Sequence, residues 1–376
     1  MTATYTVGWI CALPSEMAAA RAMLDEDRGP PHEQDISDRN SYRLGRIGEH
    51  DVVIACLPAG VYGTTSAASV AVQMLSSFPS IRIGLLVGIG GGVPSEGVDI
   101  RLGDVVVSKP GMQSGGVIQY DMGKNLAGNW IQTGSLNKPP QALLTAVASL
   151  EADHLMGENR IAEFLQEAAK KHPRMQQEFC CSPGVEHDQL FEADYLHPAE
   201  NKTCASCDPR RLKDRPPRIP DGPQIHYGQI ASANQVMKDG VTRDKLGREL
   251  GVICFEMEAA GLMDTFPCLV IRGICDYADS HKNKRWQKYA AMTAAACAKE
   301  LLLDGIPRGR VADKSAEKQA LETGQWEKSV VSPSSSPPRF DINQGRSIFS
   351  GTNYATSGRV NQIGNIASGS GNVMLN

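Results

Sequence analysis

Residues 268–279, CLVIRGICDYAD, form an apolar run that ends in acidic residues. A short apolar run of this kind is typical of a strand that is buried on both faces of a parallel sheet. Asp276 would then stand at the carboxyl end of the strand, where open α/β sheets place their ligand sites. A carboxylic acid at that place can serve as a general acid, although Asp is also favoured at the N-cap of a helix. This single stretch therefore indicates both a class of sheet and a candidate site.

Strands and helices alternate along the rest of the chain. Pro14-Ser15 predicts the start of a helix at Glu16, and residues 41–57 predict a hairpin around Gly48. Other strands and helices are predicted at residues 5–13, 64–75, 81–87, 104–108, 139–172, 225–236, 251–264 and 286–303. This alternation predicts an α/β fold with a mostly parallel, twisted central sheet flanked by helices. We expect residues 1–304 to form that domain.

Three segments depart from this pattern. Residues 174–223 crowd prolines, four cysteines and a basic cluster together, which predicts a long insertion or lid. Residues 305–340, which contain SVVSPSSSPPR, have the composition of a linker. Residues 341–376 form a low-complexity C-terminal tail that is poor in charge and rich in Gly, Asn and Ser. Such a tail is either disordered or able to form cross-β structure.

The composition limits the partners that the chain can have. Its 376 residues carry 38 Lys and Arg against 42 Asp and Glu, which argues against general affinity for nucleic acid or an anionic membrane. No window approaches the ~20 apolar residues that span a bilayer, and the first residues lack the pattern of a secretory signal. Several of the ten cysteines lie in apolar, strand-like segments, where Cys behaves as a buried hydrophobe. We therefore expect a reducing, cytoplasmic location.

Two more motifs could carry chemistry. Glu256 and Glu258 flank Met257 directly after an apolar strand. A carboxylate beside a ribose can accept hydrogen bonds from both vicinal hydroxyls and favours an oxocarbenium ion, although acids are also common in the first turn of a helix. Residues 88–92, GIGGG, follow a strand and would let backbone N–H groups approach an anion. Because their spacing is not the dinucleotide-binding fingerprint, we expect no cofactor.

Six motifs occur in one order along the chain: GWICALPSE (8–16), AGVYG (59–63), VGIGGGVP with LGDVVVS (87–94 and 102–108), IHYGQIASANQVMKDG (225–240), CFEMEAAG (254–261) and VIRGICDYADSHKN (270–283). In this order the chain resembles the nucleoside phosphorylase and nucleosidase superfamily, which includes purine nucleoside phosphorylases and methylthioadenosine nucleosidases. More specifically, it is similar to the fungal branch found as effector domains beside NOD-like receptors. The resemblance covers about residues 4–304 and implies an enzyme that acts on purine nucleosides.

The resemblance implies roles around the base and the sugar. Asp276 matches the acid that protonates or hydrogen-bonds N7 of the purine as the base departs. Glu258 matches the glutamate that holds the ribose 2′- and 3′-hydroxyls, and Met257 would pack on the sugar. The segment that closes over the base is matched by Val236, Met237 and the adjacent Asn234.

The resemblance also bears on the nucleophile. Glu16 matches the glutamate that activates water in hydrolytic members, although Ser15-Glu16 is also an ordinary helix start. The loops around the nucleophile are matched by Gly60, Gly90, Gly91 and Gly92. Many members have a hydroxyl residue at the position of Ile89, and that hydroxyl helps to hold phosphate or the attacking water. Its absence here favours water over phosphate.

We accordingly predict a purine nucleosidase that hydrolyses the N-glycosidic bond of adenosine, inosine, AMP or ATP. The alternative is a purine nucleoside phosphorylase with inorganic phosphate as its second substrate. Family members are oligomers whose pockets often border a neighbouring subunit, so we expect a homo-oligomer. A hypothesis of another class is an effector module of a fungal immunity-like pathway. In that case residues 348–367 of the tail would drive assembly or bind a NOD-like receptor.

The insertion carries a basic cluster, formed by Arg210, Arg211, Lys213, Arg215 and Arg218. These side chains either meet ligand phosphates, which would suit a nucleotide substrate, or form a solvated basic loop.

The insertion also carries four cysteines, namely Cys180, Cys181, Cys204 and Cys207. One C-x-x-C pair beside one adjacent pair is a poor spacing for a structural zinc site. From the cysteines alone we expect no metal.

Overall fold

The computed structural model describes residues 5–306, apart from residues 113, 128, 199, 201, 202 and 220. The predicted linker and tail lie outside the described residues, except for residues 305 and 306. No helix in the described part of the chain is long and apolar enough to cross a bilayer.

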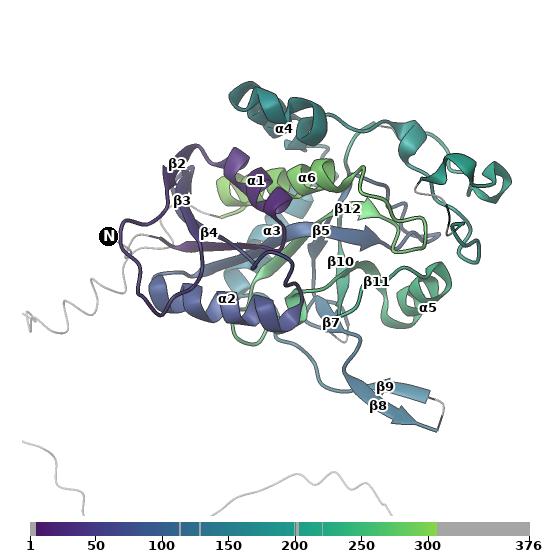
Figure 1. The fold of residues 1–376 in the computed structure, drawn as a ribbon, viewed down its shortest axis with the longest axis horizontal. Coiled ribbons are helices and arrows are strands. Elements are labelled where there is room, and N and C mark those ends of the chain that lie inside the picture. The colour runs from purple at the N-terminus through teal and green to yellow at the C-terminus, as the bar shows by residue number, and fades with distance from the viewer. Residues whose placement is uncertain are drawn as a thin grey trace, which may run out of the picture. The chain divides into compact units, whose positions relative to one another are not determined.

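Among the described residues, ten strands form one sheet (Figure 1). They are β1 (Val7–Cys11), β2 (Glu26–Gly29), β3 (Tyr42–Ile47), β4 (His50–Cys56), β5 (Ile83–Gly92), β6 (Val105–Ser108), β7 (Val117–Gln119), β10 (Ile225–Ser232), β11 (Val252–Glu256) and β12 (Leu269–Asp276). Their order is β11-β10-β6-β12-β5-β1-β4-β3-β2, with β7 beside β10. The pairs β1–β4, β1–β5, β5–β12, β6–β10, β7–β10 and β10–β11 are parallel, which confirms the predicted sheet. A separate hairpin, β8 (Gly123–Leu126) and β9 (Asn129–Gln132), projects away from it (Figure 1).

One part of the sheet closes on itself. Strand β11 pairs with β10 on one side and runs antiparallel to β5 on the other, through Cys254–Gly92 and Phe255–Gly91. Strands β5, β12, β6, β10 and β11 therefore form a closed ring, while β1, β4, β3 and β2 continue outward from β5. The closure pairs both edges of β11 and brings the residues that follow it close to the ends of β5 and β12.

Helices cover both faces of the sheet (Figure 1). They are α1 (Pro14–Met23), α2 (Thr64–Ser77), α3 (Gln141–Leu155), α4 (Ile161–Lys171), α5 (Gly240–Leu250) and α6 (Gln287–Glu300). One apolar core joins α1, α3, α4 and α6 to the sheet, and a second core joins α2 to its other face. Residues 289–300 of α6 are all buried, because its alanines let the helix lie close to β5 and β12. The helix predicted after β11 is wrong in extent, since only a 3₁₀ turn, Ala259–Gly261, forms there.

The described residues of the 174–223 insertion contain short helical turns and one isolated bridge, Phe191–Leu212. The insertion is nevertheless anchored on the segment that follows β12. The Tyr277 hydroxyl donates a hydrogen bond to Asp188, and Trp286 Nε1 donates to the carbonyl of His187 at 3.1 Å. The insertion therefore packs beside the predicted site without forming a regular domain of its own.

Candidate active site

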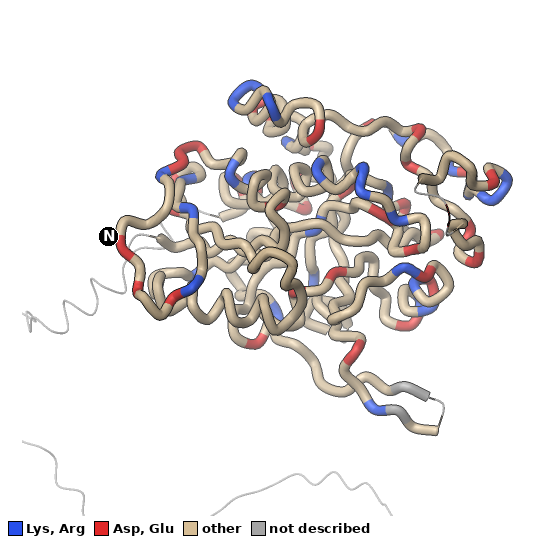
Figure 2. Tube along the Cα trace, viewed as in Figure 1, with Lys and Arg blue, Asp and Glu red and all other residues tan. Residues whose placement is uncertain are grey.

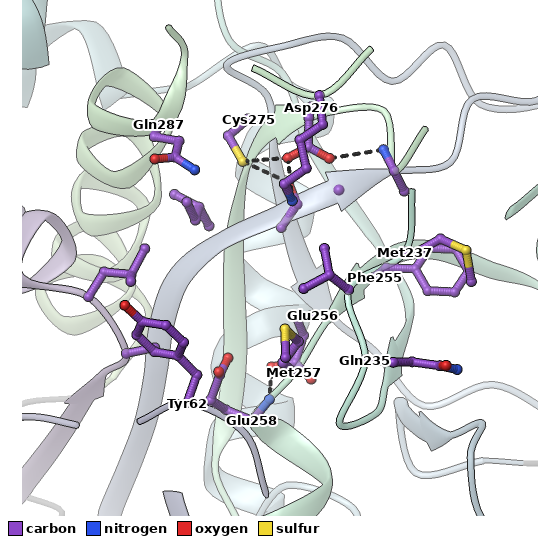
Figure 3. Close-up of a pocket in the computed structure, with 18 of the residues that line it drawn as sticks. Tyr62, Gln235, Met237, Phe255, Glu256, Met257, Glu258, Cys275, Asp276 and Gln287 are labelled. Atoms are coloured by element: carbon purple, nitrogen blue, oxygen red, sulfur yellow. Dashed lines mark hydrogen bonds and ion pairs between the residues drawn. The ribbon is translucent and has the colours of Figure 1, made fainter. Parts of the chain in front are cut away.

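The carboxyl ends of β1, β5, β11 and β12 meet around a cavity of about 220 Å³ (Figure 3). Most of the predicted site residues line it, namely Glu16, Gly90, Gly91, Val236, Met237, Met257, Glu258 and Asp276. The cavity is not lined by Gly60, Gly92 or Asn234. Parallel strands that end at one edge of a sheet explain why residues so distant in sequence converge here.

Asp276 is the last residue of β12 and is fixed by three neighbours, one of which is the Cys275 thiol, 3.0 Å from Oδ2. Its Oδ1 accepts the backbone N–H of Ala278 at 2.9 Å, and its Oδ2 lies 2.8 Å from Nζ of Lys282. Ala278 has a φ of 52°, a conformation uncommon for a non-glycine residue and often found at functional sites. Burial acts to lower the pKa of Lys282, but the Asp276 carboxylate outweighs it, so that pKa is raised. Lys282 therefore keeps its positive charge beside Asp276.

A buried charge cluster around Arg272 adjoins the cavity. Arg272 lies in the middle of β12 and is 1% exposed. Its Nη2 forms an ion pair with Glu256 and lies 3.4 Å from Oε2 of Glu258. Burial raises the pKa of Glu258 to about 7, although Arg272 acts to lower it. Arg272 therefore stabilises negative charge on a carboxyl group that burial alone would keep neutral.

The two glutamates of this cluster have different surroundings. Glu256 accepts hydrogen bonds from the backbone N–H groups of Glu258 and Ala259 at 3.0–3.1 Å, so it holds the turn after β11. Glu258 accepts only long hydrogen bonds, from the N–H of Gly63 at 3.3 Å and from Nη2 of Arg272 at 3.4 Å. In Figure 3, Glu258 and Asp276 lie at opposite ends of the labelled cluster. Glu258 is therefore the freer of the two glutamates to meet a ligand hydroxyl.

Glu16 is both a helix-capping residue and part of the cavity wall. Its Oε2 accepts the N–H groups of Ala12 and Leu13 at 2.7 and 2.9 Å, and its Oε1 accepts the N–H of Ile89 at 2.9 Å. A carboxylate offers about four acceptor positions, so one remains for a ligand or water. Burial raises the pKa of Glu16 despite Arg272 and these three donors. The two interpretations of Glu16 are thus compatible.

The glycine run 88–92 is not a loop, because all five residues belong to β5. Its backbone pairs with β12 through Gly90–Ile274 and with β11 through Gly91–Phe255. The prediction that Gly90, Gly91 and Gly92 belong to a loop is therefore wrong, whereas their place beside the nucleophile stays a prediction. The glycines make room for charged groups instead. A Cβ on Gly88 would lie 2.5 Å from both Arg272 Nη1 and Glu16 Oε1, and one on Gly91 would lie 2.9 Å from Asp276 Oδ1.

Asn234 acts on the site through the turn that precedes α2. Its Oδ1 accepts the N–H of Thr64 at 2.9 Å, and its Nδ2 donates to Thr64 Oγ1 at 2.8 Å. Thr64 follows Gly63, whose N–H meets Glu258. Gly60, with a φ of 79°, makes the turn in which this segment begins. Asn234 and Gly60 therefore position the Glu258 end of the cavity without lining it.

Apolar and amide side chains complete the wall of the cavity. They are Leu13, Tyr62, Ile89, Gln235, Val236, Met237, Phe255, Met257 and Gln287. The ring of Phe255 is fixed by an edge-on contact with Tyr120, at 5.3 Å between centroids. An apolar wall beside several carboxylates suits a ligand with one flat aromatic part and one hydroxylated part.

The four arginines of the basic cluster in the insertion meet carboxylates of the protein itself. Arg210 pairs with Asp208, Arg211 with Glu192 and Asp194, Arg215 with Asp188, and Arg218 with Asp104. Figure 2 shows basic and acidic residues intermixed over this part of the chain. No described residue of the insertion lines the cavity, so nothing here supports contact with ligand phosphates. A solvated loop is also wrong for Arg215 and Arg218, whose side chains are 15% and 14% exposed.

Two charged residues of the site, Arg272 and Lys282, were not predicted from the sequence. Arg272 could have been predicted, since an arginine inside the apolar run of β12 must find buried partners. Those partners are Glu256, at the end of β11, and Glu258, in the turn that follows it. Lys282 could not have been predicted in this way, because its pairing with Asp276 depends on the turn at Ala278.

The phosphorylase superfamily matches residues 6–304, so the chain belongs to that superfamily, as the motifs predicted. It is 50% identical over 298 residues to a nucleotide-binding leucine-rich repeat (NLR)-like protein of Hyaloscypha variabilis; the match covers 79% of this chain and 29% of that relative. The chain thus spans less than a third of the relative's length. It is 24% identical over 302 residues to a 5′-methylthioadenosine/S-adenosylhomocysteine nucleosidase of Mycobacterium bovis, covering 79% of this chain and 95% of that protein.

Among solved structures, a Borrelia burgdorferi protein described as a 5′-methylthioadenosine/S-adenosylhomocysteine nucleosidase, bound to adenine, matches with a TM-score of 0.51 and 17% identity. The match covers 79% of this chain and 99% of that one. It shows that the two chains share a fold.

Proposed function

We propose that this chain hydrolyses the N-glycosidic bond of a purine nucleoside or adenine nucleotide, releasing the free base. The observation that carries the proposal is the convergence of Glu16, Glu258 and Asp276 on one cavity with an apolar wall. Acids in separate surroundings can take separate roles in glycosidic cleavage.

Asp276 acts on the base in this mechanism. As the C1′–N9 bond breaks, its electrons move into the purine, and N7 accepts a proton through the Asp276 carboxyl group. That proton comes from the ammonium group of Lys282, 2.8 Å from Asp276, which is left as a neutral amine. The hydrogen bond from Ala278 fixes the carboxyl group while this happens.

Glu258 acts on the sugar. Its carboxylate accepts hydrogen bonds from the 2′- and 3′-hydroxyls, and its charge stabilises the oxocarbenium ion that develops at C1′. Arg272 favours the ionised form of Glu258 that this role needs. Met257 lies in the cavity wall beside it and packs on the sugar ring.

Glu16 acts on water. Its unused acceptor position takes a proton from water as the water oxygen bonds to C1′. The charges around the cavity favour this nucleophile over phosphate. Four acids line the cavity (Glu16, Glu256, Glu258 and Asp276) against one lysine, which is already paired with Asp276. A phosphate dianion would be repelled from such a wall, whereas neutral water would not.

Incubation of the full chain with adenosine, inosine, AMP and ATP, with and without phosphate, tests this proposal. We expect chromatography to detect free base in both conditions. A strict requirement for phosphate, with ribose 1-phosphate or its derivative as product, would leave the phosphorylase alternative. A homo-oligomer stays a prediction, which light scattering of the same sample tests.

A second role, as an effector module associated with a receptor, is supported by the 50% identity over 298 residues to an NLR-like protein. We propose that the tail brings copies of the enzyme together or joins them to a receptor. The full chain should then pellet as dye-binding β assemblies, whereas a chain ending at residue 340 should stay in solution. A full chain that shows neither pelleting nor a β signal would remove this role.

A further inference from the structure

Three side chains of types that can bind a metal ion lie close together in the insertion, away from the cavity. The ligand atoms of His197, Cys204 and Cys207 all lie within 4.8 Å of one another. Cys207 is buried, and the other two are half-buried. Because His197 stands seven residues before the cysteine pair, the spacing of the cysteines gave no hint of it.

The backbone of the C-x-x-C segment is already arranged as a ligand turn. Residues 204–206 form a single 3₁₀ turn, and the N–H of Cys207 donates to the carbonyl of Cys204 at 3.1 Å. Both thiols therefore lie on one short, constrained loop, as in structural zinc sites with C-x₂-C spacing. In a tetrahedral zinc site the donors stand about 3.6–3.8 Å apart, as Zn–S and Zn–N bonds of about 2.3 and 2.0–2.1 Å require. A contraction of about 1 Å would close the observed group on an ion.

We propose that His197, Cys204 and Cys207 bind a zinc ion that fastens the insertion to the segment following β12. Two thiolates and an imidazole form a soft, nitrogen-and-sulfur donor set, which selects zinc over magnesium or calcium. Cys180 and Cys181 are not members of the group.

The surroundings of His281 point independently to a ligand. His281 is 6% exposed, and its ring contacts the rings of Phe191 and Tyr195 in stacked orientations, at 4.1 and 5.3 Å between centroids. Neither of its ring nitrogens has a hydrogen-bond partner among the described residues. The closest charged group, Asp279, stands 3.8 Å from Nδ1, too far for a hydrogen bond. The His281 ring lies 5.4 Å from that of His197 but outside the three-residue group, so it would have to move toward His197 to supply a fourth ligand.

A metal ion here would connect two parts of the insertion, His197 and the Cys204–Cys207 turn, to the segment that follows β12. The N–H of His197 donates to Ser280 Oγ at 2.9 Å, and Cys204 Sγ contacts the carbonyl of His281 at 3.8 Å. Lys282, the partner of Asp276, is the next residue. A metal ion at this point would hold Lys282 and Asp276 in register without touching a substrate. The metal proposal stands whether or not the chain is a nucleosidase.

Metal analysis of the full chain, after loading with zinc and gel filtration, tests the proposal. We expect about one tightly held zinc ion per chain. Cobalt in its place should give thiolate charge-transfer and tetrahedral d–d absorption bands. Cys204→Ser, Cys207→Ser and His197→Ala should each lose the metal and these bands, whereas Cys181→Ser, at an exposed cysteine of the same insertion, should keep both.

Two results would overturn the assignment. One is a wild-type chain that emerges without stoichiometric metal while both thiols remain free to react with an alkylating reagent. The other is a Cys204–Cys207 disulfide in the chain purified under reducing conditions, seen by mass spectrometry. Because both are measured on the wild type, neither depends on whether a variant folds.

Discussion

Replacing Arg272 with methionine tests the charge cluster beside the cavity. Arg272 is 1% exposed and pairs with Glu256 and Glu258, so the variant leaves buried carboxylates without their cation. Methionine retains much of the side-chain volume, which limits the effect of a cavity. Removal of one partner from a buried ion pair lowers the free energy of unfolding by about 3–5 kcal/mol.

The loss of stability in Arg272→Met should depend on pH, because a carboxyl group of the cluster will take up a proton in place of the missing arginine. Its folded-state pKa is then raised, so its contribution to stability is present at low pH and is lost as the pH rises. From a reference pKa of about 4.3 and ~1.4 kcal/mol per pH unit, protonation costs ~5 kcal/mol at about pH 8 and ~1.6 kcal/mol at about pH 5.5. The deficit of the variant should therefore shrink by about 3 kcal/mol between these conditions.

Guanidinium unfolding of the wild type and two variants at both pH values measures this effect. Arg46→Met is the matched control, since Arg46 pairs with Glu49 at the surface, where the side chains are 44% and 64% exposed. Such a pair contributes less than about 1 kcal/mol. A decrease in the free energy of unfolding of Arg272→Met that is the same at both pH values, or no larger than that of Arg46→Met, would show that Arg272 does not balance the charge of the buried carboxylates.

Three further predictions concern the acids of the cavity. Asp276→Asn should lower kcat/KM for base release about 10²–10⁴-fold with little change in Tm, and wild-type kinetics would exclude the acid role. Glu16 has a raised pKa, so its protonation, together with that of Glu258, should lower wild-type kcat/KM as the pH drops; Glu16→Gln should make this acidic limb less steep, and an unchanged pH profile would count against Glu16 as the base. The pKa of Glu258 is raised to about 7, so its stabilising neutral form is lost as the pH rises through 7. In Glu258→Gln, denaturant titrations should show a pH dependence of stability flatter by up to ~3 kcal/mol, and an unchanged slope would contradict the burial argument.

The sequence was sufficient for the framework of the site because the framework depends on local pattern. The apolar run of β12 and the position of Asp276 at its end follow from hydrophobicity and strand length alone. Glu16 at a helix start follows from capping rules. The parallel sheet then places such strand ends on one edge, so most of the predicted site residues meet.

The remaining features of the site depend on contacts between strands that are far apart in the sequence, which a local sequence pattern does not predict. The glycines at 88–92 resemble a loop until β11 pairs with β5 and extends the strand through them. The ion pairs of Arg272 form only when β12 lies beside Glu256, at the end of β11, and Glu258, in the turn after it. The arginines of the insertion resembled a phosphate-binding cluster because the irregular fold of the insertion, which pairs Arg215 with Asp188, and the contact of Arg218 with the distant Asp104 leave no local pattern.

If water attacks C1′, the oxygen atom of the solvent must become bonded to that carbon of the sugar product, and labelling with ¹⁸O can detect it. The full chain would act on adenosine in phosphate-free H₂¹⁸O, with the sugar product trapped at once by borohydride and weighed by mass spectrometry. We expect free adenine and a sugar alcohol that carries one ¹⁸O atom. The amount of label should exceed what ribose added to a control sample takes up by exchange with the solvent. Adenine released without solvent label in the sugar, or released only when phosphate is added, would contradict the attack of water at C1′.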